Sequence, residues 1–272
     1  MQKGLVIGME ALALEVKNVT KKYHSFELEN ISFELKQGFI LGIVGRNGAG
    51  KTTLMQTLFS PKFSDGGEII ICGTDAVKYP LAAKKQIGIL TEEAPFLYHK
   101  TLSENAGLFG AFYDEFLAEE FFAYLERFEL SAGKVYSELS KGMRMKFQLA
   151  FALAHKPKLL LMDEATAGLD VVFRKEFFYL LQEAVEKSML SVVITTHITE
   201  DLDKLADYVA CIEDGRLKFC CSKEELYEDY YNYLKNTGVS PQNISRGTAH
   251  LEDVIICYDA FSKKKQFEET SA

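Results

Sequence analysis

The chain has 272 residues, of which 47% are hydrophobic and 26% charged, with a formal net charge of −8. This composition is typical of a globular protein of one large domain or two small ones. The acidic balance argues against a broad nucleic-acid surface, and no apolar run approaches the roughly 18 residues that span a bilayer. The start, Met1–Met9, is too weak for a signal peptide, which predicts a cytoplasmic protein. The five cysteines contain no C-x-x-C pair, so neither a disulfide framework nor a zinc site is indicated.

The first third of the chain predicts strands around a glycine-rich loop. Apolar residues alternate with other residues at 12–16 and 31–35, as in half-buried strands. A continuous apolar run at 39–44 is typical of a strand buried on both faces. The elements expected next are a helix at 51–59 and strands at 68–72 and 86–90.

The middle of the chain, from about 93 to 155, predicts a helical insertion. Thr101-Leu102-Ser103-Glu104 is a capping box that opens a helix ending at about Phe112. Aromatic residues then continue at helical spacing, and Pro157 ends the helical stretch. We expect most of these aromatic side chains to lie in a hydrophobic core.

The last part returns to alternating strands and helices, which favours an α/β fold with a parallel sheet. Residues 213–216 predict a turn between two strands, at 208–212 and 217–219. We assign 1–220 to one domain and 221–272 to a C-terminal extension. The other elements expected here are a strand at 158–162, a helix at 171–187, a strand at 191–195, and, in the extension, a helix, a loop at 238–247 and a short apolar strand at Val254–Cys257.

Residues 45–52, GRNGAGKT, match the phosphate-binding loop G-x-x-x-x-G-K-[ST]. Its glycines let the backbone curl so that N–H groups point at an anion, and the following helix adds its positive end. A glycine-rich loop of chance composition is the alternative, which the position between an apolar strand and a helix makes weak. The predicted ATP contacts are Gly45, Asn47, Gly48, Gly50, Lys51, Thr52 and Thr53, with Thr52 also a ligand of Mg²⁺.

Asp163 and Glu164 directly follow the apolar strand at 158–162. Open α/β sheets bind ligands at the carboxyl ends of their strands. Asp163 is therefore the expected carboxylate ligand of Mg²⁺, and Glu164 is placed to polarise an attacking water. A solvated loop is the alternative, and the phosphate loop upstream argues against it.

Leu139-Ser140-Lys141-Gly142-Met143 resembles the LSGGQ signature of the ATP-binding subunits of ABC transporters, and the resemblance extends over residues 12–219. It implies a P-loop NTPase core, with an N-terminal antiparallel β subdomain and an inserted α-helical subdomain. It also implies that Ser140 and Gly142 contact the γ-phosphate held by a second subunit. Lys141 and Met143 depart from the consensus. Lys141 either adds charge near the phosphate or points outward, and we favour the second.

Four further segments carry the same resemblance. Ala167–Asp170 resembles the D-loop, and His197 resembles the switch histidine that contacts the γ-phosphate and orients water. Tyr23 stands where the family stacks an aromatic ring on adenine, although a packed surface tyrosine is a serious alternative. Glu92 replaces the usual glutamine and would reach Mg²⁺ as an oxygen ligand while adding negative charge. A minority of the aromatic residues at 96–128 would line a groove for a helix of a membrane subunit.

The resemblance implies an ATPase that dimerises head to tail around two ATP molecules with Mg²⁺ and drives a separate membrane permease. We favour a homodimer, which would have two competent sites because Glu164 and His197 are both present, with a heterodimer as the alternative. The complex would lie on the inner face of the cell membrane. With Lys141 and Met143 in its signature and Glu92 in place of glutamine, the chain resembles the branch of the family that exports drugs, antimicrobial peptides and lipids. A soluble ABC-type ATPase of iron–sulfur cluster assembly is the main alternative. Translation-linked ABC proteins carry two cassettes, and chromosome-maintenance ATPases are split by a long coiled coil, so both fit less well.

Overall fold

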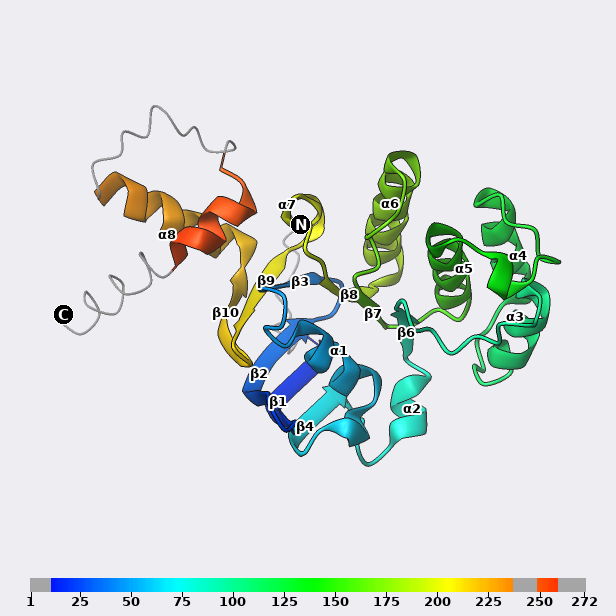
Figure 1. Ribbon diagram of the computed structural model, residues 1–272, viewed down its shortest axis with the longest axis horizontal. Helices are drawn as coiled ribbons and strands as arrows, with labels where there is room; N and C mark the ends of the chain where they lie inside the picture. The colour runs from blue at the N-terminus through cyan, green and yellow to red at the C-terminus, as the bar shows by residue number, and fades with distance from the viewer. Residues whose placement is uncertain (1–10, 237–248, 259–272) are drawn as a thin grey trace, which may run out of the picture.

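The computed structural model describes residues 11–236 and 249–258 and contains two β-sheets with helices around them (Figure 1). The smaller sheet comes mostly from the start of the chain and is antiparallel, with the strand order β2-β1-β4-β5. Its strands are β1 Leu12–Lys22, β2 Glu27–Lys36, β4 Gly66–Ile71 and β5 Thr74–Asp75. This sheet is the predicted N-terminal antiparallel subdomain.

The larger sheet has six strands in the order β10-β9-β3-β8-β7-β6. Neighbouring strands from β9 to β6 pair in parallel, whereas β10 returns antiparallel to β9 through the predicted turn. The strands are β3 Ile40–Val44, β6 Ile87–Leu90, β7 Leu159–Asp163, β8 Ser191–Thr195, β9 Tyr208–Glu213 and β10 Arg216–Ser222. The predicted parallel sheet is thus confirmed.

The continuous apolar strands are buried on both faces, as their composition predicts. In β7, Leu159 and Leu161 join the core that lies against β1, β2 and β4, together with apolar residues of α1, Lys51–Phe59. Leu160 and Met162 join the other core, which the helices α5, Lys141–Ala154, and α6, Val171–Ser188, help to build. Side chains alternate along a strand, so one strand contributes to both cores.

The segment between β6 and β7 is helical and lies to one side of the sheets (Figure 1). The predicted capping box is present, because Thr101 Oγ1 accepts from the Glu104 N–H at 3.1 Å and Glu104 Oε2 accepts from the Thr101 N–H at 2.8 Å. Phe96 lies at the centre of the aromatic core, with its ring 4.7 Å from that of Phe147 and 5.3 Å from that of Phe151. The elements here are α3 Leu102–Gly110, α4 Ala118–Arg127, the 3₁₀ turn η2 Tyr136–Glu138, and α5.

Three short elements complete the part of the chain that precedes residue 223. None of the helices within 11–236 and 249–258 is long and apolar enough to cross a membrane. The short elements are the 3₁₀ turn η1 Pro61–Phe63, α2 Pro80–Lys84 and α7 Thr199–Leu205.

The C-terminal extension contains α8, Lys223–Asn236, and a second helix at 251–258. The predicted strand at Val254–Cys257 is therefore wrong. A short apolar run does not by itself distinguish a strand from a buried helix. Here Leu251 and Val254, three residues apart, are both fully buried, whereas Ile256 is exposed, which is the pattern of one helix face against the core. The predicted loop at 238–247 and the Met1–Met9 segment lie outside the described residues.

Candidate functional site

The phosphate loop joins β3 to α1, as predicted, and its lysine lies inside the loop. Lys51 is only 7% exposed, and its Nζ donates to the carbonyl oxygens of Gly45 at 2.7 Å and Arg46 at 3.2 Å. The ammonium group is thus held at the centre of the curled backbone, next to the N-terminus of α1. An anion that enters the loop meets a positioned positive charge.

Two glycines make this curl possible. Gly50 has φ +113°, and a Cβ there would lie 2.8 Å from the ring of Phe26. A Cβ at Gly45 would collide with the carbonyl oxygen of Ile212. Gly50 is the N-cap of α1 and supplies no side-chain acceptor, so the N–H groups of the first turn remain available to a ligand.

Asp163 is the last residue of β7, and Thr195 ends the neighbouring strand β8. The hydroxyl of Thr195 donates to Asp163 Oδ1 at 2.5 Å. The pKa of Asp163 is raised above its ordinary value, mainly because the carboxyl group is buried. The hydrogen bond from Thr195 and the charge of Lys51 oppose this rise, whereas the charge of Glu164 adds to it. A cation that binds the other carboxylate oxygen would favour the ionised form.

The oxygen atoms at this position suit a Mg²⁺ ion that also binds a substrate phosphate. No group of three or more His, Cys, Asp or Glu side chains within the described part of the chain could hold a metal ion by itself. Mg²⁺ is commonly bound through one or two carboxylates together with substrate phosphates and water. Asp163 and the exposed hydroxyl-bearing residue Thr52 at the start of α1 supply oxygen ligands of this kind.

Glu164 and His197, both predicted to be catalytic, are in direct contact. Glu164 Oε2 lies 2.6 Å from Nδ1 of His197, and the two side chains are 30% and 59% exposed. The backbone of Glu164 is left-handed, with φ +51°, and its N–H donates to both the carbonyl and the hydroxyl oxygen of Thr195. This turn presents a carboxylate, oriented by an imidazole, at the carboxyl end of the sheet.

Thr195 was not predicted to have a role, yet its hydroxyl links Asp163 to the backbone of Glu164. The sequence contained a signal, since a threonine ends the parallel strand that adjoins the strand ending in Asp163. The register pairs Asp163 directly with Thr195. This pairing follows from the strand order, which the sequence alone does not specify.

The signature segment lies at the start of α5. Ser140 is the N-cap of this helix, and its Oγ accepts from the Met143 N–H at 3.3 Å. Gly142 lies beside the D-loop, since a Cβ there would be 3.6 Å from the carbonyl oxygen of Gly168. Lys141 extends along the surface, and its Nζ lies 3.2 Å from Glu92 Oε2.

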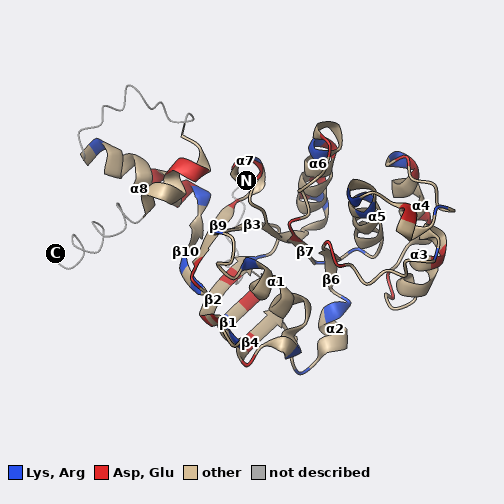
Figure 2. Ribbon diagram, in the orientation of Figure 1, with Lys and Arg blue, Asp and Glu red and all other residues tan. Residues whose placement is uncertain are grey.

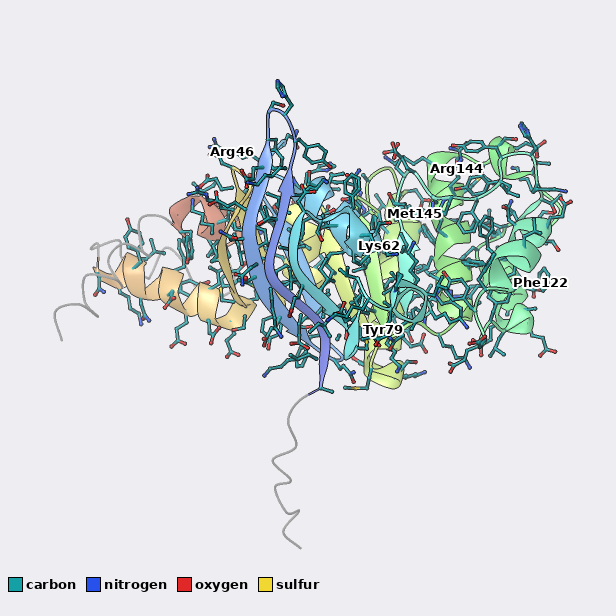
Figure 3. All side chains as sticks on the ribbon, turned by 90° about the horizontal axis from the view of Figure 1, so that it is seen from below. Arg46, Lys62, Tyr79, Phe122, Arg144 and Met145 are labelled. Atoms are coloured by element: carbon teal, nitrogen blue, oxygen red, sulfur yellow. The ribbon has the colours of Figure 1, made fainter. Side chains whose placement is uncertain are left out.

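The phosphate loop and the signature helix lie apart in one chain. In Figure 3, Arg46 of the phosphate loop and Arg144 of the first turns of α5 lie along the same edge of the molecule, on opposite sides of the antiparallel strands. In this view the start of α5 is therefore separated from the phosphate loop of the same chain.

Tyr23 follows the last residue of β1 and is 43% exposed. Its ring centroid lies 6.4 Å from that of Phe63, and the Lys21 Nζ lies 5.6 Å from the Tyr23 centroid. An exposed aromatic face of this kind suits both interpretations that the sequence left open. Its contact with adenine stays a prediction.

A parallel sheet, a phosphate loop with a buried lysine, and two carboxylates at a neighbouring strand end define the class of P-loop nucleotide hydrolases. A family model described as "ABC transporter" matches residues 28–167, and the chain belongs to this family. It is an ATPase and the ATP-binding subunit of an ABC transporter. The predicted family, fold class and enzymatic activity are confirmed.

Three relatives show the range of proteins that resemble this chain. YtrB, an ABC transporter ATP-binding protein of Bacillus subtilis, is 29% identical over 95% of the chain and 89% of its own length. The linearmycin resistance ATP-binding protein LnrL of the same species is 30% identical over 89% of this chain and 82% of its own length. A probable sulfate/thiosulfate import ATP-binding protein, CysA of Chlorella vulgaris, is 31% identical over 79% of this chain and 93% of its own length.

Solved structures agree on the fold. An ATP-binding subunit of an ABC transporter superposes with a TM-score of 0.76 over 90% of this chain and 98% of its own, at 23% identity. The cassette MJ0796 is described as a dimer in a post-hydrolysis state bound to ADP and Pi. It gives a TM-score of 0.69 over 77% of this chain and 98% of its own, also at 23% identity.

Proposed function

We propose that two copies of this subunit, or this subunit and a related one, close head to tail around two ATP molecules and drive a separate membrane permease. The observation that carries the proposal is the separation of two half-sites in one chain. Lys51 and Asp163 lie at the phosphate loop and the end of β7, whereas Ser140 is the N-cap of α5. Figure 3 shows Arg46 of the phosphate loop and Arg144 of α5 on opposite sides of the antiparallel strands. A second subunit in the opposite orientation would bring its own Ser140 over this phosphate loop.

Each half-site has a defined chemical task in this proposal. Lys51 and the N–H groups at the start of α1 bind the β- and γ-phosphates, as do the backbone groups from Gly45 to Gly50. Thr52 and Asp163 would hold Mg²⁺, which supplies positive charge against the phosphates. The Ser140 hydroxyl and the N-terminus of α5 would approach the γ-phosphate from the partner subunit.

Glu164 is the proposed group that orients the attacking water and accepts its proton. His197 lies 2.6 Å from its carboxylate and fixes the direction in which the carboxylate points. Phosphoryl transfer depends mainly on positioning and charge stabilisation, so a held carboxylate beside the γ-phosphate is a suitable device. His197 would also reach the γ-phosphate in the closed site.

A groove between the helical segment and the sheet supports the permease as partner. It has a volume of about 570 Å³, and its lining is mostly apolar and aromatic. Leu81 and Phe112 at its rim are 78% and 70% exposed, which is costly unless a partner covers them. Lys84, in the last turn of α2, adds a positive charge to the lining, and Figure 2 shows basic residues at one end of α2. An amphipathic helix of a permease fits such a groove.

We propose export as the direction of transport. The name of LnrL refers to linearmycin resistance, and Lys141, Met143 and Glu92 stand where the sequence departs from the family consensus in the manner of the exporting branch. Membrane attachment would come through the permease, on the inner face of the cell membrane.

The test is capture of the tagged chain from detergent-solubilised membranes, followed by identification of the bound proteins. A membrane-spanning permease should be recovered with the parent and lost with Phe112→Glu, while the ATPase activity of the isolated subunit is retained. Tyr179→Glu is the matched control, because Tyr179 is an exposed aromatic residue on α6 outside the groove. Recovery of a soluble scaffold of iron–sulfur cluster assembly instead of a permease would support the alternative function.

A further inference from the structure

Helix α5 holds the loop that follows β6 at two adjacent residues. The buried amide of Gln148 accepts from the Thr91 N–H at 2.9 Å and donates to the Thr91 carbonyl at 3.0 Å. One residue further along the loop, Glu92 Oε2 lies 3.2 Å from the Lys141 Nζ. Lys141 and Gln148 are seven residues apart, two helical turns, and so lie on one face of α5.

The two contacts differ in physical kind. Gln148 is 2% exposed and makes neutral hydrogen bonds to the backbone, so this contact fixes the loop. The side chains of Lys141 and Glu92 are 43% and 69% exposed, so their charge pair is open to water and responds to salt and to other charges. The stem of Lys141 also lies along the D-loop, with its Cδ 3.5 Å from a Cβ placed on Gly168.

Glu92 brings a negative charge to the nucleotide end of the sheet. It stands two residues after Leu90, which pairs with Met162 immediately before Asp163. Parallel strands end at the same edge, so Glu92 shares that edge with the carboxylates of Asp163 and Glu164. A third carboxylate without a cation beside it would repel the triphosphate of ATP.

We propose that Lys141 is a positioning residue whose task is to neutralise Glu92 and to hold it away from the triphosphate, in place of the Mg²⁺ contact that the family resemblance implies for Glu92. The inference rests on the proposed nucleotide site and adds a role for two residues that depart from the family pattern. The lysine in the signature and the glutamate after β6 then act as one neutral unit within a single chain. Lys141 does not itself bind the phosphate.

The test is a cycle of variants assayed for the KM of Mg-ATP and for kcat. Lys141→Ala should raise KM about fivefold in the Glu92 background, with a smaller change in kcat, since an exposed charge pair near an anion has an effect of this order. In the Glu92→Gln background the same substitution should change KM less than about twofold, because no charge is left to neutralise. Raising the ionic strength should reduce the Lys141→Ala effect.

Lys187→Ala is the matched control, because Lys187 forms an exposed pair with Glu183 at 2.6 Å on α6, and its KM should equal that of the parent. An equal loss from Lys141→Ala in both backgrounds would mean that Lys141 binds the phosphate directly and would overturn the inference. No effect of Lys141→Ala would overturn it as well. Binding of a fluorescent ATP analogue should show the same pattern, and Glu164→Gln tests the nucleotide site separately, so the two failures are distinguishable.

Discussion

The two halves of the proposed ATP site differ in how firmly one chain holds them. In the phosphate-loop half, Lys51 at the start of α1 donates to two carbonyl oxygens. At the ends of β7 and β8, Asp163 accepts from Thr195, and Glu164 contacts His197. In the signature half, Ser140 stands at an exposed helix start with one capping hydrogen bond. Side-chain contacts within one chain hold the first half, whereas in the proposed dimer a partner subunit completes the second.

The largest expected effect comes from Glu164→Gln in the organised half. The amide keeps the size and hydrogen bonding of the side chain but loses its basicity, and a positioned general base contributes about 10²–10⁴-fold. We therefore expect kcat to fall by about that factor while ATP binding is retained, measured by phosphate release and titration calorimetry. Glu200→Gln, at an exposed glutamate in the first turn of α7, should behave as the parent. Unchanged turnover in Glu164→Gln would remove this residue from the reaction.

Lys51→Ala should weaken ATP binding by about a hundredfold, since a hydrogen bond to a charged group is worth up to about 3 kcal/mol. Titration calorimetry measures this directly. Lys62→Ala, which removes an exposed lysine of η1 (Figure 3), should bind ATP as the parent does. Near-normal affinity in Lys51→Ala would disprove the assignment of the phosphate loop.

Thr195→Val tests whether the hydroxyl organises both carboxylates. The substitution keeps the shape but removes the bonds to Asp163 Oδ1 and to the Glu164 N–H, so we expect kcat to fall about tenfold and the free energy of unfolding by about 2 kcal/mol. Thr57→Val is the control, because this buried hydroxyl bonds only the Leu54 carbonyl within α1. It should lower stability by about 1 kcal/mol without lowering kcat. Parallel losses of kcat in both variants would show a general packing effect.

Tyr23→Ala should weaken ATP binding several-fold, because stacking on a base is worth about 1–3 kcal/mol. Tyr23→Phe keeps the aromatic face and should bind ATP almost as well as the parent. Equal losses in the two variants would indicate that the hydroxyl, and not the ring, contacts the nucleotide. The measurement is again titration calorimetry.

The sequence predicts the organised half well because its signals are local. A glycine-rich loop between an apolar strand and a helix, and an Asp-Glu pair after another apolar strand, each specify a strand end. The role of Thr195 depends on which strands adjoin, and the Lys141–Glu92 pair joins residues 49 positions apart in the chain. Such contacts come from tertiary structure, which periodicity does not report.

The C-terminal helix at 251–258 was mispredicted for a related reason. Four apolar residues in a row, Val254–Cys257, satisfy a strand pattern by themselves. The helix is favoured by burial of Leu251 and Val254 against the core and by the bond from the His250 N–H to Asp253 Oδ2 at its start. A strand and a helix at 254–257 are therefore distinguished by how the segment packs on the core, and the sequence of the segment does not show this.

The central claim is that Ser140 of one subunit completes the phosphate loop of the other. Mixing Ser140→Arg with Lys51→Ala subunits tests it most directly. In a mixed dimer, one composite site has its lysine from the first variant and its serine from the second, and is intact. The other site carries both lesions. The measurement is ATPase activity after cross-linking has shown that mixed dimers form. We predict clear activity from the mixture where each variant alone has almost none; a mixture as inactive as its parents would contradict the head-to-tail arrangement.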